Sequence, residues 1–375
     1  MQQTPVTAPN RLDRIRMVFL RLWRAGSVPI AAVLLASLVI AILLIVSGAS
    51  PSEAYAALIK GSFGSAAAFT RTLEKATPLI FSGLAVAFAF KAGLFNIGAQ
   101  GQLLLGAITA AWLGFAIQGL PAWIHAPLAL LGGALVGGLY GAIPGALKTF
   151  TGAHEVIVTI MLNFIAINLT DYLADGPFKD TSFGNIVAQT PKVQPSAEIG
   201  SIGSFPIGFL IGLVFCVVTW WVLSRTTIGY EVRTVGLNPH ASRYAGIRVA
   251  RTVILTMVIS GLLAGIGGAV ETQGVVGRFQ PGFNTGLGFD GITIALLGKT
   301  NPFGVIPAAL LVGALKAGSS QMQFDAGVPS EIIDLIQGLI LFFVAADVIV
   351  RWIVRTRRTA GEEDVTLSTF WGAQK

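Results

Sequence analysis

Six polar side chains inside long apolar stretches are the strongest candidates for chemistry in this sequence. They are Asn96, Gln100, Gln102, Asn163, Glu271 and Asp290. Polar groups within a bilayer are costly and usually face a partner group or an aqueous path. Since four of the six are neutral amides, the set favours a path for a small, neutral solute that forms hydrogen bonds. Interhelical hydrogen bonding is the alternative interpretation for each residue.

Signals for an enzyme are weak. The three His residues are far apart in sequence, and His154 lacks the second His four positions later that a metalloprotease helix needs. Gly298-Lys299-Thr300 resembles the end of a phosphate-binding loop, but Thr293 stands where that motif requires glycine. We therefore expect no catalytic residue, no metal site and no cofactor, and we expect any ATP hydrolysis to belong to another chain.

The composition predicts an all-α, polytopic membrane protein. Of 375 residues, 54% are hydrophobic and only 11% are charged, against roughly 25% charged in an average soluble domain. Too few charged groups remain to cover so much apolar surface in water. The single cysteine, Cys216, lies in an apolar run and is interpreted as a small buried hydrophobic residue.

Ten apolar stretches are candidates for membrane-spanning helices, which need about 20 apolar residues each. The first exceeds the apolar core of about 7–15 residues found in a cleaved signal peptide, so we expect it to be retained. The ten are 28–47, 77–91, 99–117, 126–147, 155–173, 206–224, 252–271, 288–299, 302–321 and 332–350.

The distribution of Lys and Arg predicts that both termini are cytoplasmic. Ten crossings from a cytoplasmic N-terminus place most of the 25 basic residues on the inner side, as the positive-inside rule requires. The net charge of +7 then needs no nucleic acid. This orientation gives a basic N-terminus (1–27), one transmembrane domain (28–350) with an inner loop (225–251) and an outer loop (174–205), and a cytoplasmic tail (351–375).

Two spans, Thr77–Lys91 and Gly288–Lys299, look too short to cross the bilayer alone. Short or interrupted apolar segments in corresponding halves indicate inverted repeats with broken helices that meet near the midplane. We therefore expect spans two to five and seven to ten to form an inverted pair. Glycines at four-residue spacing predict close helix packing at Gly133, Gly137, Gly141 and Gly145, and at Gly261 and Gly265.

The inner loop contains a predicted short helix. Asn238 can cap a helix whose first residue is Pro239, where the missing N–H costs nothing. That helix would end near Ala245 and present Arg243 and Tyr244 to a partner. An interfacial helix held by lipid headgroups is the alternative.

Four motifs in fixed order resemble bacterial ABC-importer permeases for sugars and purine nucleosides. They are GLFNIGAQGQLLLG (93–106), GLNPHASRYAG (236–246), FDGITIALLGKTNPFG (289–304) and Met322…Pro329. The resemblance covers about residues 77–350. It is closest to the nucleoside-type permeases that work with basic-membrane-protein lipoproteins, and branched-chain amino-acid permeases share the architecture.

The resemblance implies a bacterial inner-membrane permease with no ATPase activity of its own. Its implied partners are a cytoplasmic ABC ATPase, a second permease that is a paralogue or an identical copy, and an extracytoplasmic solute-binding lipoprotein. The segment that resembles the coupling helix contains Gly236, Asn238, Pro239, Arg243, Tyr244 and Gly246. The expected solute is a nucleoside, with a simple sugar or a branched-chain amino acid as alternatives.

This sequence departs from many relatives at two positions. Gln100 stands where they carry Glu, and His154 stands where they carry Asn. A role copied from that Glu therefore does not transfer directly. Other classes remain as alternatives: an ion-gradient-driven secondary transporter, which the lack of acids in mid-span disfavours, a channel-like pore, and a membrane-embedded hydrolase.

Overall fold

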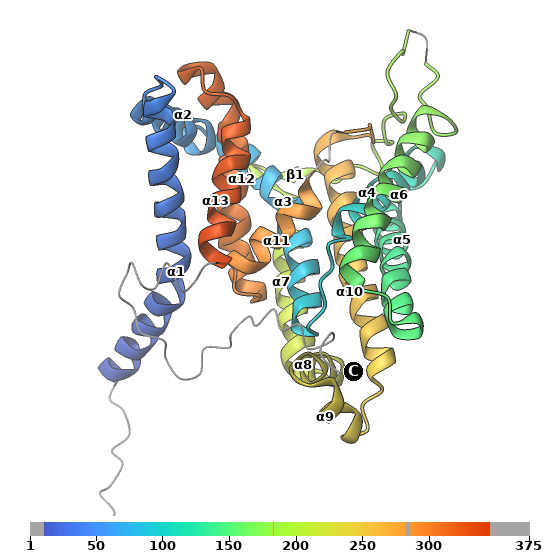
Figure 1. Cartoon of the computed structure of the whole chain (residues 1–375). Coiled ribbons are helices and arrows are strands. Elements are labelled where there is room, and N and C mark those ends of the chain that lie inside the picture. Colours follow the sequence, from blue (N-terminus) through green and yellow to red (C-terminus); the bar gives the residue numbers. More distant parts are fainter. Residues whose placement is uncertain (1–10, 183, 283–285, 346–375) are drawn as a thin grey trace, which may run out of the picture. The chain divides into compact units, whose positions relative to one another are not determined.

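The structure is a computed structural model that describes residues 11–182, 184–282 and 286–345. The predicted tail (351–375), the end of the last predicted span (346–350) and the first ten residues lie outside the described residues. The described chain is mainly helical (Figure 1). Its elements are α1 (Arg11–Val46), α2 (Pro51–Phe63), α3 (Ala66–Lys91), α4 (Ala99–Ala116), α5 (Ala122–Thr151), α6 (Glu155–Asp175), β1 (Ser201–Ile202), β2 (Phe205–Pro206), α7 (Ile207–Arg225), α8 (Thr227–Leu237), α9 (Pro239–Tyr244), α10 (Val249–Glu271), the π-helix η1 (Thr272–Val276), α11 (Leu287–Leu297), α12 (Pro302–Ala326) and α13 (Glu331–Ala345).

Eight of the described helices are long and apolar enough to cross a membrane: α1, α3, α4, α5, α6, α7, α10 and α12. The other two predicted spans coincide with α11, which has 11 residues, and with α13, of which 15 residues are described. A polytopic helical membrane protein is therefore confirmed, whereas the count of ten crossings stays a prediction. The apolar scan did not predict α2.

The predicted start of one span was wrong. The stretch 77–91 was expected to be too short, but α3 begins at Ala66 and has 26 residues, or about 39 Å at 1.5 Å per residue. The Ser65 hydroxyl accepts a hydrogen bond from the Ala68 amide at 3.1 Å and caps the helix. The scan missed its first turns because they carry Arg71, Glu74 and Lys75.

The chain divides into two compact units. One contains α1 and α13 from Asp334 onward. The other runs from Ser52 to Ile333 and holds all the candidate residues named above. We describe the second unit, and call its two ends the β1–β2 end and the α8–α9 end.

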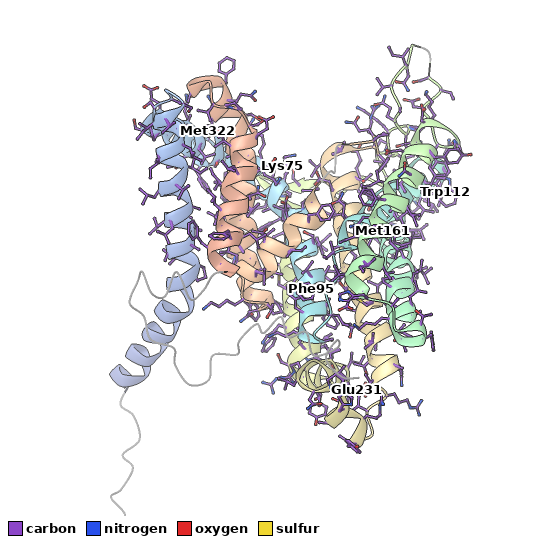
Figure 2. All side chains as sticks on the ribbon, in the orientation of Figure 1. Lys75, Phe95, Trp112, Met161, Glu231 and Met322 are labelled. Atoms are coloured by element: carbon purple, nitrogen blue, oxygen red, sulfur yellow. The ribbon has the colours of Figure 1, made fainter. Side chains whose placement is uncertain are left out.

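Helix α3 connects these two ends. Near its start, the Thr70 hydroxyl donates to the Ser204 carbonyl in the β1–β2 turn at 3.0 Å. At its other end, Gly236 of α8 packs on the backbone of Lys91. Figure 2 accordingly shows Lys75 toward the β1–β2 end and Glu231 of α8 at the opposite one.

Helices α4 and α11 both begin in the interior of this unit. At their starts, the Gly288 amide donates to Gln100 Oε1 at 2.7 Å, and Gly291 packs on the backbone of Ser82, within α3. From there α4 runs to the β1–β2 end, where Gly114 packs on Val193. Helix α11 runs toward the other end, where Phe303, at the start of α12, lies 5.7 Å from Trp220 between ring centroids.

Helices α5 and α10 pack backbone to backbone, at glycines where the sequence predicted close helix packing without naming the partner helix. A Cβ at Gly137 would lie 2.6 Å from the Gly261 carbonyl oxygen and 2.7 Å from the Gly265 Cα. One turn away on either side, a Cβ at Gly141 would meet the Met257 carbonyl oxygen of α10, and a Cβ at Gly133 would lie 2.6 Å from the Gly106 carbonyl oxygen of α4 and 2.9 Å from the Ala269 Cβ of α10. Without a hydrophobic force between helices in lipid, such close approach supplies the van der Waals contact that holds them together.

Candidate functional site

Asn96 and Gln102 form a buried amide pair. The Asn96 Nδ2 donates to Gln102 Oε1 at 2.8 Å, and Gln102 Nε2 returns a bond to Asn96 Oδ1 at 3.1 Å. Asn96 Nδ2 also donates to the Ser260 hydroxyl at 2.8 Å, which in turn donates to the Ala85 carbonyl at 2.6 Å. This chain of hydrogen bonds joins α3, α4, α10 and the connection between α3 and α4.

Gln100 and Asn163 satisfy the starts of the two interior helices. The first amides of a helix have no partner within it, and water is not available in a bilayer to replace one. Gln100 Oε1 accepts from the Gly288 amide near the start of α11. Asn163 Oδ1 accepts from the Gly101 amide of α4 at 2.8 Å, and its Nδ2 donates to the Ile97 carbonyl at 2.9 Å.

The structure therefore brings four of the six candidates together and gives each a structural partner. Interhelical hydrogen bonding, the alternative interpretation, accounts for the hydrogen bonds described above for Asn96, Gln100, Gln102 and Asn163. All four are nearly fully buried. Their contact with a solute stays a prediction.

The two acidic candidates lie apart from this group. Asp290, in the first turn of α11, pairs with Lys316 of α12 at 3.0 Å between oxygen and nitrogen. Glu271 ends α10 at the point where the helix changes to the π-helix η1. Its carboxylate is buried, and its Oε2 accepts no hydrogen bond from the described residues.

The predicted helix of the inner loop is confirmed as α9. Asn238 Oδ1 accepts from the His240 and Ala241 amides, both at 3.0 Å, and Pro239 is the first helical residue. Tyr244, at the end of α9, is 94% exposed. Such exposure of a large aromatic side chain leaves it available to a partner.

The base of this loop is fixed to the transmembrane helices. Gly236 packs on the backbone of Lys91 at the end of α3, and the Thr252 hydroxyl of α10 donates to Glu231 of α8 at 3.2 Å. Movement of α9 and α8 therefore reaches both α3 and α10 directly.

Sequence reasoning missed three polar contacts. Ser260 was overlooked because a single hydroxyl in an apolar span is a weak signal. Lys316 was not singled out, because its acidic partner Asp290 lies on another helix. Lys148 and Glu155, on either side of the connection between α5 and α6, form a buried ion pair at 2.5 Å, which their spacing across a turn could have indicated.

His154, one of the two departures, precedes this pair. It stands at the N-cap of α6, where its side chain makes no capping bond. Its ring is 67% exposed, with Nδ1 4.0 Å from Glu155 Oε2. The structure thus places it at the surface beside a charge that Lys148 already neutralises.

Comparison with known proteins places the chain in a family. A model described as "Branched-chain amino acid transport system / permease component" matches residues 68–345. The guanosine ABC transporter permease protein NupP of Bacillus subtilis is 42% identical over 89% of this chain and 97% of its own length. The nucleoside permease NupB of Lactococcus lactis is 36% identical (86% and 91% covered), and the glucose permease TsgB13 of Haloferax volcanii is 34% identical (86% and 87%). The chain is a permease of the branched-chain amino acid transport system / permease component family.

Proposed function

We propose that this chain is a transmembrane subunit of an ABC importer that takes up a nucleoside. The observation that carries the proposal is the match, over nearly the whole of both chains, to permeases named for guanosine and for nucleosides. The interior of the described bundle agrees with it, because the polar groups gathered there are neutral amides and hydroxyls. A neutral solute would meet no uncompensated charge beside them.

The proposed partners are suggested by the relatives, which are named as permease proteins of ABC transporters. A cytoplasmic ABC ATPase would dock on α9, where Tyr244 is exposed and the base of the loop contacts α3 and α10. A second permease, identical or a paralogue, would complete the path, and a solute-binding lipoprotein would deliver the solute at the β1–β2 end. The bacterial inner membrane is the proposed location.

The proposed orientation puts the α8–α9 end and both termini in the cytoplasm. Basic residues at that end include Lys91, Arg225, Arg233, Arg243 and Arg251, which supports this orientation by the positive-inside rule. The proposed inverted repeat pairs spans two to five (α3–α6) with spans seven to ten (α10–α13), so that α3 and α4 correspond to α10 and α11. In its support, each pair has a long helix followed by a shorter one that starts at the Gln100–Gly288 contact, and the two shorter helices run in opposite directions.

ATP-dependent uptake by the reconstituted complex tests the function. The chain would be expressed with its ATPase, second permease and binding lipoprotein, and proteoliposomes would be supplied with labelled guanosine, glucose or leucine. We expect uptake of guanosine that needs ATP and the ATPase. A matched complex whose ATPase cannot hydrolyse ATP should show none.

Two results would contradict this assignment. Uptake of glucose or leucine in preference to guanosine would keep the transporter class and replace the solute, and the 34% identity to a glucose permease makes glucose the second candidate. Uptake by this chain alone under an ion gradient, without ATP, would make it a secondary transporter.

A further inference from the structure

A cavity at the β1–β2 end is built from three separate segments. It has a volume of about 280 Å³, close to the lower limit of roughly 300 Å³ for small-molecule sites. Glu74 comes from α3, Lys192 and Glu198 from the connection that follows α6, and Gln273 from η1. The backbone of Gly274–Gly277 supplies the remainder of one wall.

Unpartnered polar atoms lie at the turn from α10 into η1. Glu271 Oε2, Thr272 Oγ1 and Gln273 Oε1 are buried oxygens of three consecutive residues with no hydrogen-bond partner among the described residues, and of these three residues Gln273 lines the cavity. Gln273 is 2% exposed. Buried polar atoms are rarely left in this condition without a ligand or water to satisfy them, and π-turns occur frequently at functional sites.

The orientation of Gln273 is fixed by the protein. Its Nε2 donates to the Ala126 carbonyl at 3.0 Å and to the Ala197 carbonyl at 2.8 Å. Both amide hydrogens are thereby used, so the side chain can offer a ligand only its Oε1 acceptor. The amide is therefore held as a rigid acceptor.

The chemistry of the wall selects a ligand that donates hydrogen bonds. Glu74 and Glu198 add carboxylate acceptors, and Lys192 offsets part of their charge. No group of three or more His, Cys, Asp or Glu residues suited to a metal ion occurs in the described part of the chain. A molecule with several hydroxyl or amino groups fits these walls better than an anion does, because the lining carries two carboxylates and one ammonium group.

We infer that this cavity is an entry subsite that binds the donor groups of the solute before it passes into the bundle. The inference rests on the proposed function, since the solute is taken to be a nucleoside. Gln273 Oε1 accepts from an amino or hydroxyl group of the nucleoside, and Glu74 and Glu198 accept from further hydroxyls at the rim.

Thiol labelling can test the subsite because the chain has one cysteine, Cys216, which is fully buried. A Ser201→Cys variant places an accessible thiol on the cavity wall. A Ser204→Cys variant places one in the same β1–β2 turn, also exposed but outside the wall. The rate at which a maleimide labels this chain is measured in the permease–ATPase complex with and without inosine, first without the binding protein and then with it.

We expect inosine to slow the labelling of Ser201→Cys and to leave Ser204→Cys unchanged. At about four times the dissociation constant, mass action leaves about one site in five free, so labelling slows about fivefold. Gln273→Leu, tested in the Ser201→Cys background, should abolish this protection. The matched change Gln194→Leu lies in the connection after α6, outside the cavity wall, and should preserve it.

A second variant guards against misfolding of Gln273→Leu. A Cβ at Gly274 would meet the Ile199 carbonyl oxygen at 3.4 Å, an ordinary contact, so Gly274→Val fills part of the cavity without a backbone clash. It should also abolish protection.

The possible contrary results are distinguishable. Unprotected Ser201→Cys in a complex that takes up nucleosides overturns the subsite and leaves the proposed function standing. Protection that requires the binding protein but not inosine assigns the cavity to protein docking and also overturns it. A complex that takes up no nucleoside at all overturns the proposed function, and the subsite with it.

Discussion

Gln100 of α4 and Gly288 of α11 join the starts of two helices that run in opposite directions, through a hydrogen bond of 2.7 Å from the Gly288 amide to Gln100 Oε1. A Cβ at Gly288 would collide with the backbone of Gln100. The contact therefore depends on a glycine on one side and an acceptor on the other.

Replacing the Gln100 acceptor should destabilise the protein to the extent that the Gly288 amide is left without a hydrogen-bond partner. Gln100→Leu buries the Gly288 amide without a partner, which costs about 1–3 kcal/mol. Gln100→Glu keeps an acceptor and places a negative charge at two helix N-termini, where it is favourable, so it should cost little. Thermal unfolding of the purified complex measures both, with Gln323→Leu on the exposed surface of α12 as control. Equal melting temperatures for Gln100→Leu and Gln323→Leu would refute the capping role.

The buried pair Lys148–Glu155 should show strong coupling. Removing one partner alone, as in Lys148→Met, leaves a buried charge and should cost about 3–5 kcal/mol. The double variant Lys148→Met/Glu155→Leu should recover most of that loss, because two apolar side chains replace the pair. A double-mutant cycle of unfolding free energies measures the coupling. Additive losses would mean that the two side chains do not interact.

The α5–α10 contact should not tolerate even one methyl group. Gly137→Ala puts a Cβ 2.6 Å from a backbone oxygen that cannot rotate away, and overpacking of this kind costs about 1–3 kcal/mol. Gly212→Ala on α7 is the matched control, since its Cβ would meet Ile80 at 3.4 Å. Melting temperatures of the two variants should differ, with Gly137→Ala the lower. A Gly137→Ala variant as stable as the control would show that the helices can separate slightly.

Coupling to the ATPase should depend on α9. Tyr244→Ala removes the most exposed aromatic side chain of the loop and should lower ATP-dependent uptake several-fold without changing the melting temperature. Tyr230→Ala, an exposed tyrosine on α8, provides the control. Deletion of Pro239–Gly246 should abolish uptake and leave membrane insertion intact. Uptake that survives the deletion would exclude α9 as the coupling element.

Much of this fold could be predicted from the sequence, because apolar length and turn chemistry are local properties. The cap of α9 needed only Asn238 followed by Pro239, and close packing along α5 and along α10 needed only glycines at a fixed spacing, although the spacing did not show that these two helices pack on each other. The start of α3 was predicted incorrectly for the same reason. A hydropathy scan reads only local apolarity, so it cannot distinguish the charged first turns of a helix, such as those around Arg71, from a loop.

The roles of the amides could not be predicted in this way. The sequence around Gln100 does not show whether its side chain contacts a solute or the start of another helix. Its partner Gly288 lies 188 residues away. The π-turn at Gln273 was likewise unpredictable, because the end of α10 from Gly261 to Val270 has no polar side chain and the extra residue in the turn leaves no compositional signal.

The glycine seam between α5 and α10 limits how this transporter can change shape. The two backbones touch over several turns, and few side chains separate them. We therefore expect the two helices to move as one rigid body. Any reorientation during a transport cycle is then expected to keep α5 and α10 together and to change the contacts that this pair makes with the other helices.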